Sequence, residues 1–267
     1  MFNCRRLSTI LIAAFAALPL TIRAAEAVQC GTGPGGFEAW KSAFADEAKA
    51  QGIGSAGVAA LMETHYNYPT IAADRGLKSF RLSLPDFMRK RGATVIASRG
   101  RRMKEAHAEL FSSIEERYGV PAGPLIAIWG MESGFGTQHG NQQSLSAIAT
   151  LAYDCRRPEL FTDQLMAALK LVDEGRMSAE TRGSMHGEIG QTQFLPKTML
   201  QFGVGNLDTT EGALMSTANY LKAHGWQRGA GYQPGEPNFA AIQAWNAATV
   251  YEETIAIVGK QIDGGDD

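Results

Sequence analysis

Apolar residues recur at helical spacing along most of the chain. Phe37, Trp40, Phe44 and Ala48 lie three or four positions apart, which predicts a helix with one buried face. No stretch shows a convincing alternation of strand residues. The fold is therefore expected to be mainly α, with at most a short β-hairpin. The same spacing predicts further helices over 55–61, from 84, and over 101–118, 121–133, 144–151, 158–172, 209–221, 238–245 and 250–262.

The predicted helix over 121–133 has no polar stripe before its end. It runs through Ile126-Ala127-Ile128-Trp129-Gly130-Met131 to Glu132 and then breaks into glycines. A helix that is apolar on all sides is expected to lie inside its domain. Apolar surroundings penalise the charged form of a carboxyl group, so the pKa of Glu132 should be raised, as a general acid requires. On this stretch alone, a glutamate that reaches water or pairs with an arginine is an equal alternative.

Two later segments carry side chains that suit a polysaccharide. Residues 183–205 contain five glycines, which let the backbone approach a ligand closely. Further on, Trp245-Asn246 and Tyr251 combine aromatic rings with an amide. Amides bind sugar hydroxyl and acetamido groups, while aromatic rings pack on the apolar faces of sugars. The polar residues of the glycine-rich segment are Ser184, His186, Glu188, Gln191, Thr192 and Gln193.

The N-terminal residues indicate the compartment in which the protein acts. Residues 1–27 have a basic start, an apolar middle and the small-residue motif Ala25-Glu26-Ala27, which predicts a cleaved export signal. A flexible lead-in over 28–36 and a disordered tail over 263–267 are expected at the ends of the mature chain. The apolar run is shorter than the roughly 20 residues of a spanning helix, so no stable membrane anchor is expected, with an uncleaved anchor as the alternative.

Composition and charge exclude several classes of protein. With 45% hydrophobic and 19% charged residues the chain is an ordinary globular protein. Loss of the signal removes three arginines and one glutamate, which changes the formal net charge from −2 to −4. That acidic balance argues against a nucleic-acid partner.

The cysteines and histidines point to a disulfide and away from a metal. Once Cys4 leaves with the signal, Cys30 and Cys155 remain as an even pair in an oxidising compartment. We expect them to be bonded, with two separate buried thiols as the alternative. The five histidines show no zinc-ligand spacing, so neither a metal nor another cofactor is expected.

Three segments form an ordered set of motifs along the chain. They are Glu132-Ser133-Gly134-Phe135-Gly136, Gly187-Glu188-Ile189-Gly190-Gln191-Thr192-Gln193-Phe194-Leu195-Pro196 and Ala244-Trp245-Asn246-Ala247. In this order they resemble the catalytic-cleft motifs of the lytic transglycosylases in the goose-type lysozyme-like superfamily, and most closely those of the type-B membrane-bound lytic murein transglycosylases. The resemblance implies a lysozyme-like catalytic domain over 37–262 with a helical N-terminal lobe.

The resemblance also assigns roles residue by residue. Glu132 matches the sole catalytic acid and base of the family. Other readings stay open, because Gln193 could be satisfied in a turn, Tyr251 could be a core tyrosine and the arginine pair could be a solvated corner. The residues that match substrate-binding positions are Ser184, Gln193, Asn246, Tyr251, Arg156 and Arg157.

Two positions depart from the family pattern. Some relatives carry a calcium-binding acidic loop after the second motif, but residues 202–208 offer one carboxylate, so no calcium is expected. Glu188 adds a second carboxylate where the family needs none. It could face solvent or act as an auxiliary charge in the cleft.

The activity that the resemblance implies is non-hydrolytic cleavage of the β-1,4 bond between N-acetylmuramic acid and N-acetylglucosamine in peptidoglycan, in the periplasm. The products would carry 1,6-anhydromuramic acid ends. A hydrolytic lysozyme with Glu188 as second carboxylate, and an inactive murein-binding protein, are the alternatives. Glycan strands are the expected partner, and cell-wall synthesis or secretion machinery stays open as a further one.

Overall fold

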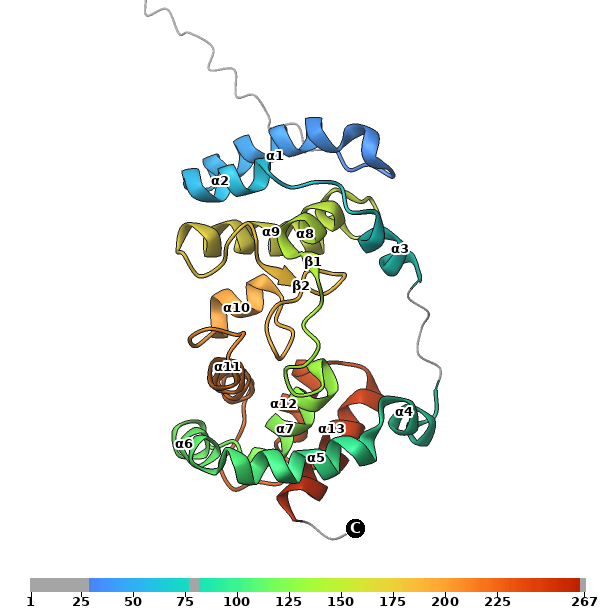
Figure 1. Cartoon of the computed structure of the whole chain (residues 1–267), viewed down its shortest axis with the longest axis vertical. Helices are drawn as coiled ribbons and strands as arrows, with labels where there is room; N and C mark the ends of the chain where they lie inside the picture. The colour runs from blue at the N-terminus through green and yellow to red at the C-terminus, as the bar shows by residue number, and fades with distance from the viewer. Residues whose placement is uncertain (1–28, 77–81, 265–267) are drawn as a thin grey trace, which may run out of the picture.

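A computed structural model describes residues 29–76 and 82–264. Within those ranges the chain forms thirteen α-helices, one 3-10 helix and two short strands, so the prediction of a mainly α protein is confirmed. The expected signal peptide over 1–27 lies outside the described residues, as do residues 265–267 of the expected tail. Figure 1 shows the helices in two groups, one above the other, which we call the upper and lower lobes.

The upper lobe surrounds one apolar core. Phe37 and Phe44 of the first helix pack there against Leu61, Leu145 and other fully buried side chains. Full burial of each such side chain stabilises the fold by roughly 1.5–3 kcal/mol. The helices of this lobe are α1 (Phe37–Ala50), α2 (Ser55–Met62), α3 (Tyr68–Gly76), α8 (Ser144–Tyr153), α9 (Pro158–Asp173) and α10 (Pro196–Phe202).

The lower lobe is built around one apolar helix, as the sequence predicts. Every residue of α7 (Ala122–Ser133) is buried except Glu132. A Cβ atom on Gly123 would lie 2.3 Å from the carbonyl oxygen of Gly259, so glycine is needed where α7 and α13 meet. The other helices of this lobe are α4 (Leu84–Arg91), α5 (Ala93–Ala106), α6 (Ala108–Tyr118), α11 (Thr210–Ala223), α12 (Phe239–Trp245) and α13 (Thr249–Asp263).

Helices α3 and α10 were not among the predicted helices, and two of the expected elements take another form. The single helix expected over 101–118 is two helices, because the chain bends at His107, which ends α5 and precedes α6. The bend lets α5 pack on α7 and α13 while α6 packs on α11. The strands β1 (Gln142–Gln143) and β2 (Arg182–Gly183) pair antiparallel, yet α8 and α9 lie between them in sequence, so they are not a hairpin.

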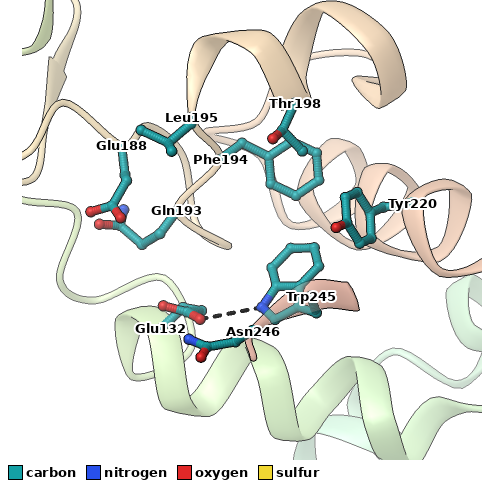
Figure 2. Close-up of a pocket in the computed structure, with 9 residues that line it drawn as sticks. All are labelled: Glu132, Glu188, Gln193, Phe194, Leu195, Thr198, Tyr220, Trp245 and Asn246. Atoms are coloured by element: carbon teal, nitrogen blue, oxygen red, sulfur yellow. Dashed lines mark hydrogen bonds between the residues drawn. The ribbon is translucent and has the colours of Figure 1, made fainter. Parts of the chain in front are cut away.

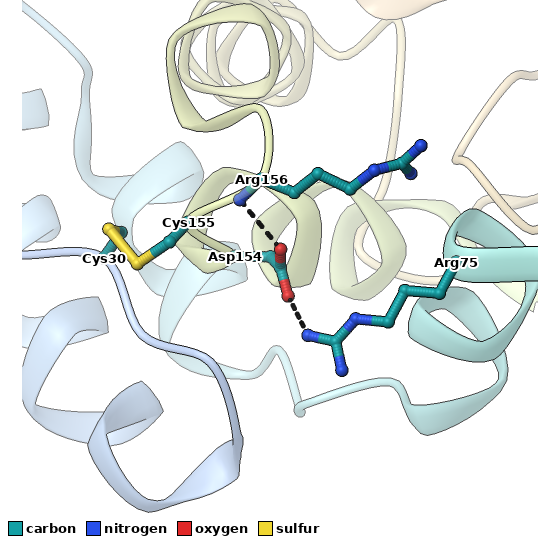
Figure 3. Close-up of a disulfide and its surroundings, with 5 residues drawn as sticks. All are labelled: Cys30, Arg75, Asp154, Cys155 and Arg156. Carbon is teal, nitrogen blue, oxygen red and sulfur yellow. Dashed lines mark hydrogen bonds and ion pairs between the residues drawn. A yellow bond between two sulfur atoms is a disulfide. The ribbon is translucent and has the colours of Figure 1, made fainter.

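The predicted disulfide between Cys30 and Cys155 is present (Figure 3). Beside it, the amide of Gly31 donates to the carbonyl oxygen of Tyr153 at 2.9 Å. A Cβ atom on Gly31 would lie 1.9 Å from the Tyr153 hydroxyl, so only glycine fits. Within the lead-in expected to be flexible over 28–36, the described residues Cys30 and Gly31 are therefore bonded to the end of α8 and the residues after it.

Candidate active site

Glu132 lies in the last turn of α7 and receives hydrogen bonds from two distant segments. The Tyr251 hydroxyl, in the first turn of α13, donates to Glu132 Oε1. Nε1 of Trp245, at the end of α12, donates to the same oxygen at 3.4 Å (Figure 2). The structure therefore brings together the first and third sequence motifs around one carboxyl group.

The surroundings of Glu132 favour its protonated form. Burial raises the pKa of Glu132 above its ordinary value. The hydrogen bonds from Tyr251 and Trp245 oppose that change, the negative charge of Glu188 adds to it, and the positive charge of Arg91 reduces it. The net pKa is raised, so Glu132 keeps its proton to higher pH than a surface glutamate. This is what a general acid needs.

Tyr251 stays a hydrogen-bond donor over the whole physiological pH range. Its side chain is buried. Burial, and then the charge of the neighbouring Glu132, raise the pKa of Tyr251 well above its ordinary value. The hydroxyl therefore remains protonated, and it fixes the orientation of the carboxyl group.

A pocket of about 180 Å³ opens over Glu132 between the lobes. Figure 2 shows Glu132, Trp245 and Asn246 on one side and Glu188 and Gln193 on the other. Its walls thus come from both lobes. The remaining lining residues are Phe194, Leu195, Thr198 and Tyr220.

Aromatic rings form one end of the pocket. The ring centroid of Trp245 lies 5.3 Å from that of Phe194 and 5.1 Å from that of Tyr220. The Tyr220 hydroxyl donates to the carbonyl oxygen of Ala244 at 2.6 Å. Trp245 and Tyr220 pack against the cores of both lobes. Sequence reasoning proposed no role for Phe194 or Tyr220, although Phe194 belongs to the second motif and Tyr220 to the predicted helix over 209–221, which is α11.

Gln193 reaches the pocket from a tight loop. Ile189 and Phe194 exchange backbone hydrogen bonds of 2.9 Å in both directions, which closes the loop between them. Gln193 has a φ of 54°, a left-handed conformation that a side chain makes costly and that often marks functional sites. Its side-chain amide donates to the carbonyl oxygen of Gly190 at 2.8 Å. The side-chain amide of Gln193 therefore has a hydrogen-bond partner within the turn, and the residue also lines the pocket.

Gln191 joins the same loop to α7, and sequence reasoning gave it no role. Its side-chain oxygen accepts from Trp129 Nε1 at 2.8 Å, and its backbone oxygen accepts from the Ser133 hydroxyl at 2.5 Å. Its side-chain nitrogen donates to the carbonyl oxygen of Asp208 at 2.7 Å. Because Trp129 and Ser133 flank Glu132, this buried residue fixes the upper wall against the helix that carries the acid. Its place among the polar residues of the glycine-rich segment was the only signal.

Ser184 does not line the pocket but contacts a residue that does. Its hydroxyl donates to Glu188 Oε2 at 2.6 Å. Asn246 lines the pocket beside Glu132, and its Oδ1 accepts from the backbone amide of Ala248 at 3.1 Å. The sugar-binding roles expected for Ser184 and Asn246 stay predictions.

The two arginines expected to bind substrate lie outside this pocket. Arg156 and Arg157 both form ion pairs with the buried carboxylate of Asp74 in α3. Figure 3 shows Arg156 beside the disulfide, where its backbone amide donates to Asp154 at 3.0 Å. They hold α3 to the segment between α8 and α9. Their role in substrate binding stays a prediction.

In the described ranges, no group of three or more His, Cys, Asp and Glu side chains is placed to hold a metal ion. Asp208 is the single carboxylate of residues 202–208, where some relatives carry a calcium-binding loop. Among the helices that the structure describes, none is both long and apolar enough to cross a membrane.

Comparison with known sequences identifies similar proteins. Residues 36–235 match the family model described as transglycosylase SLT domain. The chain is 36% identical over 137 residues to membrane-bound lytic murein transglycosylase B of Escherichia coli (strain K12). That match covers 45% of this chain and 38% of the relative, so it spans less than half of either protein.

Solved structures are similar over most of the chain. SltB3 from Pseudomonas aeruginosa, in complex with NAG-anhNAM-pentapeptide, has a TM-score of 0.78 and 28% identity, with 86% of this chain and 80% of that one covered. The E. coli lytic transglycosylase Slt35 in complex with bulgecin A has a TM-score of 0.73 over 88% of this chain and 96% of that one. At 20% identity, the second match supports the fold alone.

Proposed function

Because the chain belongs to the transglycosylase SLT domain family, we propose that it is a lytic transglycosylase of peptidoglycan. It cleaves the β-1,4 bond between N-acetylmuramic acid and N-acetylglucosamine and leaves 1,6-anhydromuramic acid ends. Residues 37–262 form the catalytic domain. The observation that carries the proposal is the half-buried Glu132, whose pKa is raised at the floor of a pocket lined by amides and aromatic rings.

In the first step Glu132 acts as an acid. Its proton goes to the oxygen of the glycosidic bond, and the electrons of the breaking C1–O bond go to that oxygen. The acetamido oxygen of the muramic acid bonds to C1 and shares its positive charge, which is the substrate-assisted route. General acid catalysis of this kind contributes on the order of 10²- to 10⁴-fold.

In the second step Glu132 acts as a base. It takes the proton of the C6 hydroxyl, whose oxygen bonds to C1 while the acetamido oxygen leaves. The hydrogen bonds from Tyr251 and Trp245 stabilise the carboxylate that exists between the two steps. One carboxyl group, restored after each turnover, is therefore enough.

The relatives support the same substrate class. SltB3 was solved with NAG-anhNAM-pentapeptide and with NAG-NAM-pentapeptide. We propose that this chain also binds glycan strands, with Gln193 and Asn246 on either side of the sugar. Ser184 acts indirectly, because its hydroxyl holds the side chain of Glu188. Arg156 and Arg157 form a second contact with the glycan, farther along the strand. A cell-wall synthesis or secretion machine is a further proposed partner.

The proposed place of action is the periplasm. The basic and apolar pattern of residues 1–27 supports export. The disulfide between Cys30 and Cys155 supports an oxidising compartment.

The test is the release of soluble fragments from purified peptidoglycan sacculi. The wild-type protein should release fragments with 1,6-anhydro ends, identified by mass. Glu132→Gln should release them at least about 100-fold more slowly. The exposed Glu105 of α5 supplies a matched control, since Glu105→Gln makes the same chemical change outside the pocket. Comparable release by wild type and Glu132→Gln would refute the assignment.

A hydrolytic lysozyme is the second candidate, because Glu188 also lines the pocket and could activate a water molecule. Hydrolysis gives reducing ends, which are heavier than anhydro ends by the mass of one water. The mass spectrum of the same fragments therefore separates the two reactions. A protein that binds sacculi without releasing fragments would be neither enzyme.

A further inference from the structure

We propose that Glu188 is a second acidic residue of the reaction, whose carboxylate stabilises the positive charge that forms on the sugar when Glu132 gives up its proton. The inference rests on the proposed function, because it concerns the cation of that mechanism. It adds a residue to a scheme that otherwise depends on one carboxyl group.

Glu188 faces the pocket from the wall opposite Glu132. Figure 2 shows its carboxylate directed into the space between the two walls, beside the side-chain amide of Gln193. The lining contains two acidic residues and no lysine, arginine or histidine. Among the described residues, Glu188 has no cationic side chain within ion-pair distance. Its charge is therefore directed at the contents of the pocket.

A closed turn holds the Glu188 side chain in place. The Ser184 hydroxyl donates to Glu188 Oε2 at 2.6 Å and accepts from the backbone amide of Glu188 at 3.2 Å. The Ser184 amide donates to the Glu188 carbonyl oxygen at 2.9 Å. One carboxylate oxygen is thus held by Ser184, while the other is left for the pocket. A charge fixed before the reaction stabilises a transition state without reorganisation.

Two glycines make this turn possible. A Cβ atom on Gly183 would lie 2.1 Å from the carbonyl oxygen of Glu188. Gly187 has a φ of 88°, and a Cβ atom there would lie 2.3 Å from the side chain of Ile148. No larger residue fits at either position, so the backbone is shaped to present Glu188 where it is.

The charge of Glu188 acts before and during the first step of the reaction. Before cleavage its negative charge favours the protonated form of Glu132, which readies the acid. As the C1–O bond breaks, it attracts the cation shared between C1 and the acetamido group. When the C6 oxygen bonds to C1, the cation disappears and the proton returns to Glu132. Glu188 forms no bond and transfers no proton.

Glu188→Gln tests the inference, since it removes the charge and keeps an oxygen that can accept from Ser184. On soluble glycan strands kcat should fall by about 10- to 100-fold, less than the roughly 10²- to 10³-fold loss on removing an oxyanion-hole donor, because Glu188 acts through space and not through a hydrogen bond to the substrate. KM should change by less than about twofold, because the cation exists only after binding. Anhydro ends should remain the product. Glu105→Gln is again the matched control.

A second measurement separates the charge from a structural role. The alkaline limb of the pH profile of kcat/KM reports the loss of the proton from Glu132. The groups that influence this proton are Tyr251, Trp245, Arg91 and Glu188. Glu188→Gln should move that limb to lower pH, and Glu188→Asp should restore most of kcat. Unchanged kcat and an unmoved limb would overturn the inference. Reducing ends in the wild type that disappear in Glu188→Gln would overturn it too, because Glu188 would then be the base for water. Failure of the proposed function would show separately, as full activity of Glu132→Gln.

Discussion

The hydroxyl of Tyr251 donates a hydrogen bond to Oε1 of Glu132, so the first turn of α13 and the last turn of α7 meet at one carboxyl group. Tyr251 is buried, and its raised pKa keeps the hydroxyl protonated. The bond orients Glu132 and stabilises its charged form. Tyr251 is therefore a positioning residue whose removal should change both the rate and the acidity of Glu132.

Tyr251→Phe should lower kcat/KM by about tenfold, the effect of losing one hydrogen bond to a charged group. Since that bond lowers the pKa of Glu132, its loss should raise this pKa and move the alkaline limb of the pH profile to higher pH. The shift is opposite to the one expected for Glu188→Gln. Tyr232→Phe is the control, because Tyr232 donates to Asp263 at 2.8 Å, away from the pocket. A limb that stays in place in Tyr251→Phe would contradict the prediction.

Gln191→Met should destabilise the fold and slow the enzyme together. Methionine fills a similar volume but cannot accept from Trp129 Nε1 or donate to Asp208. A buried donor left without a partner costs about 1–3 kcal/mol, which urea unfolding would measure. Gln138→Met makes the same change at an exposed position and should leave stability within about 0.5 kcal/mol. Equal stabilities of the two variants would show that the Gln191 contacts contribute little.

Asp74→Asn should weaken the tie between α3 and the segment after α8. Burial disfavours the charge of Asp74, but hydrogen bonds from Arg156 and Arg157 outweigh it and hold the pKa of Asp74 below its ordinary value of 3.8. Removing the charge should cost about 2 kcal/mol at neutral pH, less than for a fully buried pair because both arginines are partly exposed.

The pH dependence of this loss has a definite sign. A carboxyl group whose pKa is lower in the folded state stabilises the protein above its unfolded pKa, and the contribution disappears as the pH falls through the folded pKa. The difference between wild type and Asp74→Asn should therefore be full at neutral pH and shrink below pH 3.8. Asp163→Asn is the control, since its ion pair with Lys197 is exposed and should contribute at most about 1 kcal/mol. A loss that is constant across this pH range would contradict the charge argument.

Replacing Cys30 and Cys155 by serine should lower the free energy of unfolding. The bond closes a loop of 125 residues, and the chain-entropy model gives about 4 to 5 kcal/mol as an upper figure for such a loop. Unfolding in urea with and without a reductant would measure the loss. The reductant should affect the wild type and leave the double serine variant unchanged; an equal response of both would mean that the bond does not stabilise the fold.

The sequence was most informative where local chemistry decided the structure. The apolar run before Glu132 predicted a wrapped helix, and the structure confirms it because every other residue of α7 is buried. The even cysteine pair predicted the disulfide that is present. Gln193 and Asn246 lie in the pocket, although the order of three motifs, more than any physical pattern, pointed to them.

The sequence was least informative where residues far apart meet. At the bend at His107 the main packing partners change from α7 and α13 for α5 to α11 for α6, while the apolar spacing continues through it. The role of Gln191 depends on Trp129 and Ser133 of another segment. Arg156 and Arg157 belong to an ion-pair cluster with Asp74, which no local pattern of charges indicates.

The position of Glu132 in the last turn of α7 also has a consequence for its acidity. The peptide dipoles of a helix leave partial negative charge at the C-terminal end, which disfavours a nearby anion by about 0.3–1 kcal/mol. The backbone of α7 therefore resists the ionisation of Glu132 before any neighbouring side chain contributes. Part of the raised pKa of Glu132 is thus set by the direction in which α7 runs through the lower lobe. A glutamate in the same pocket at the start of a helix would have a lower pKa.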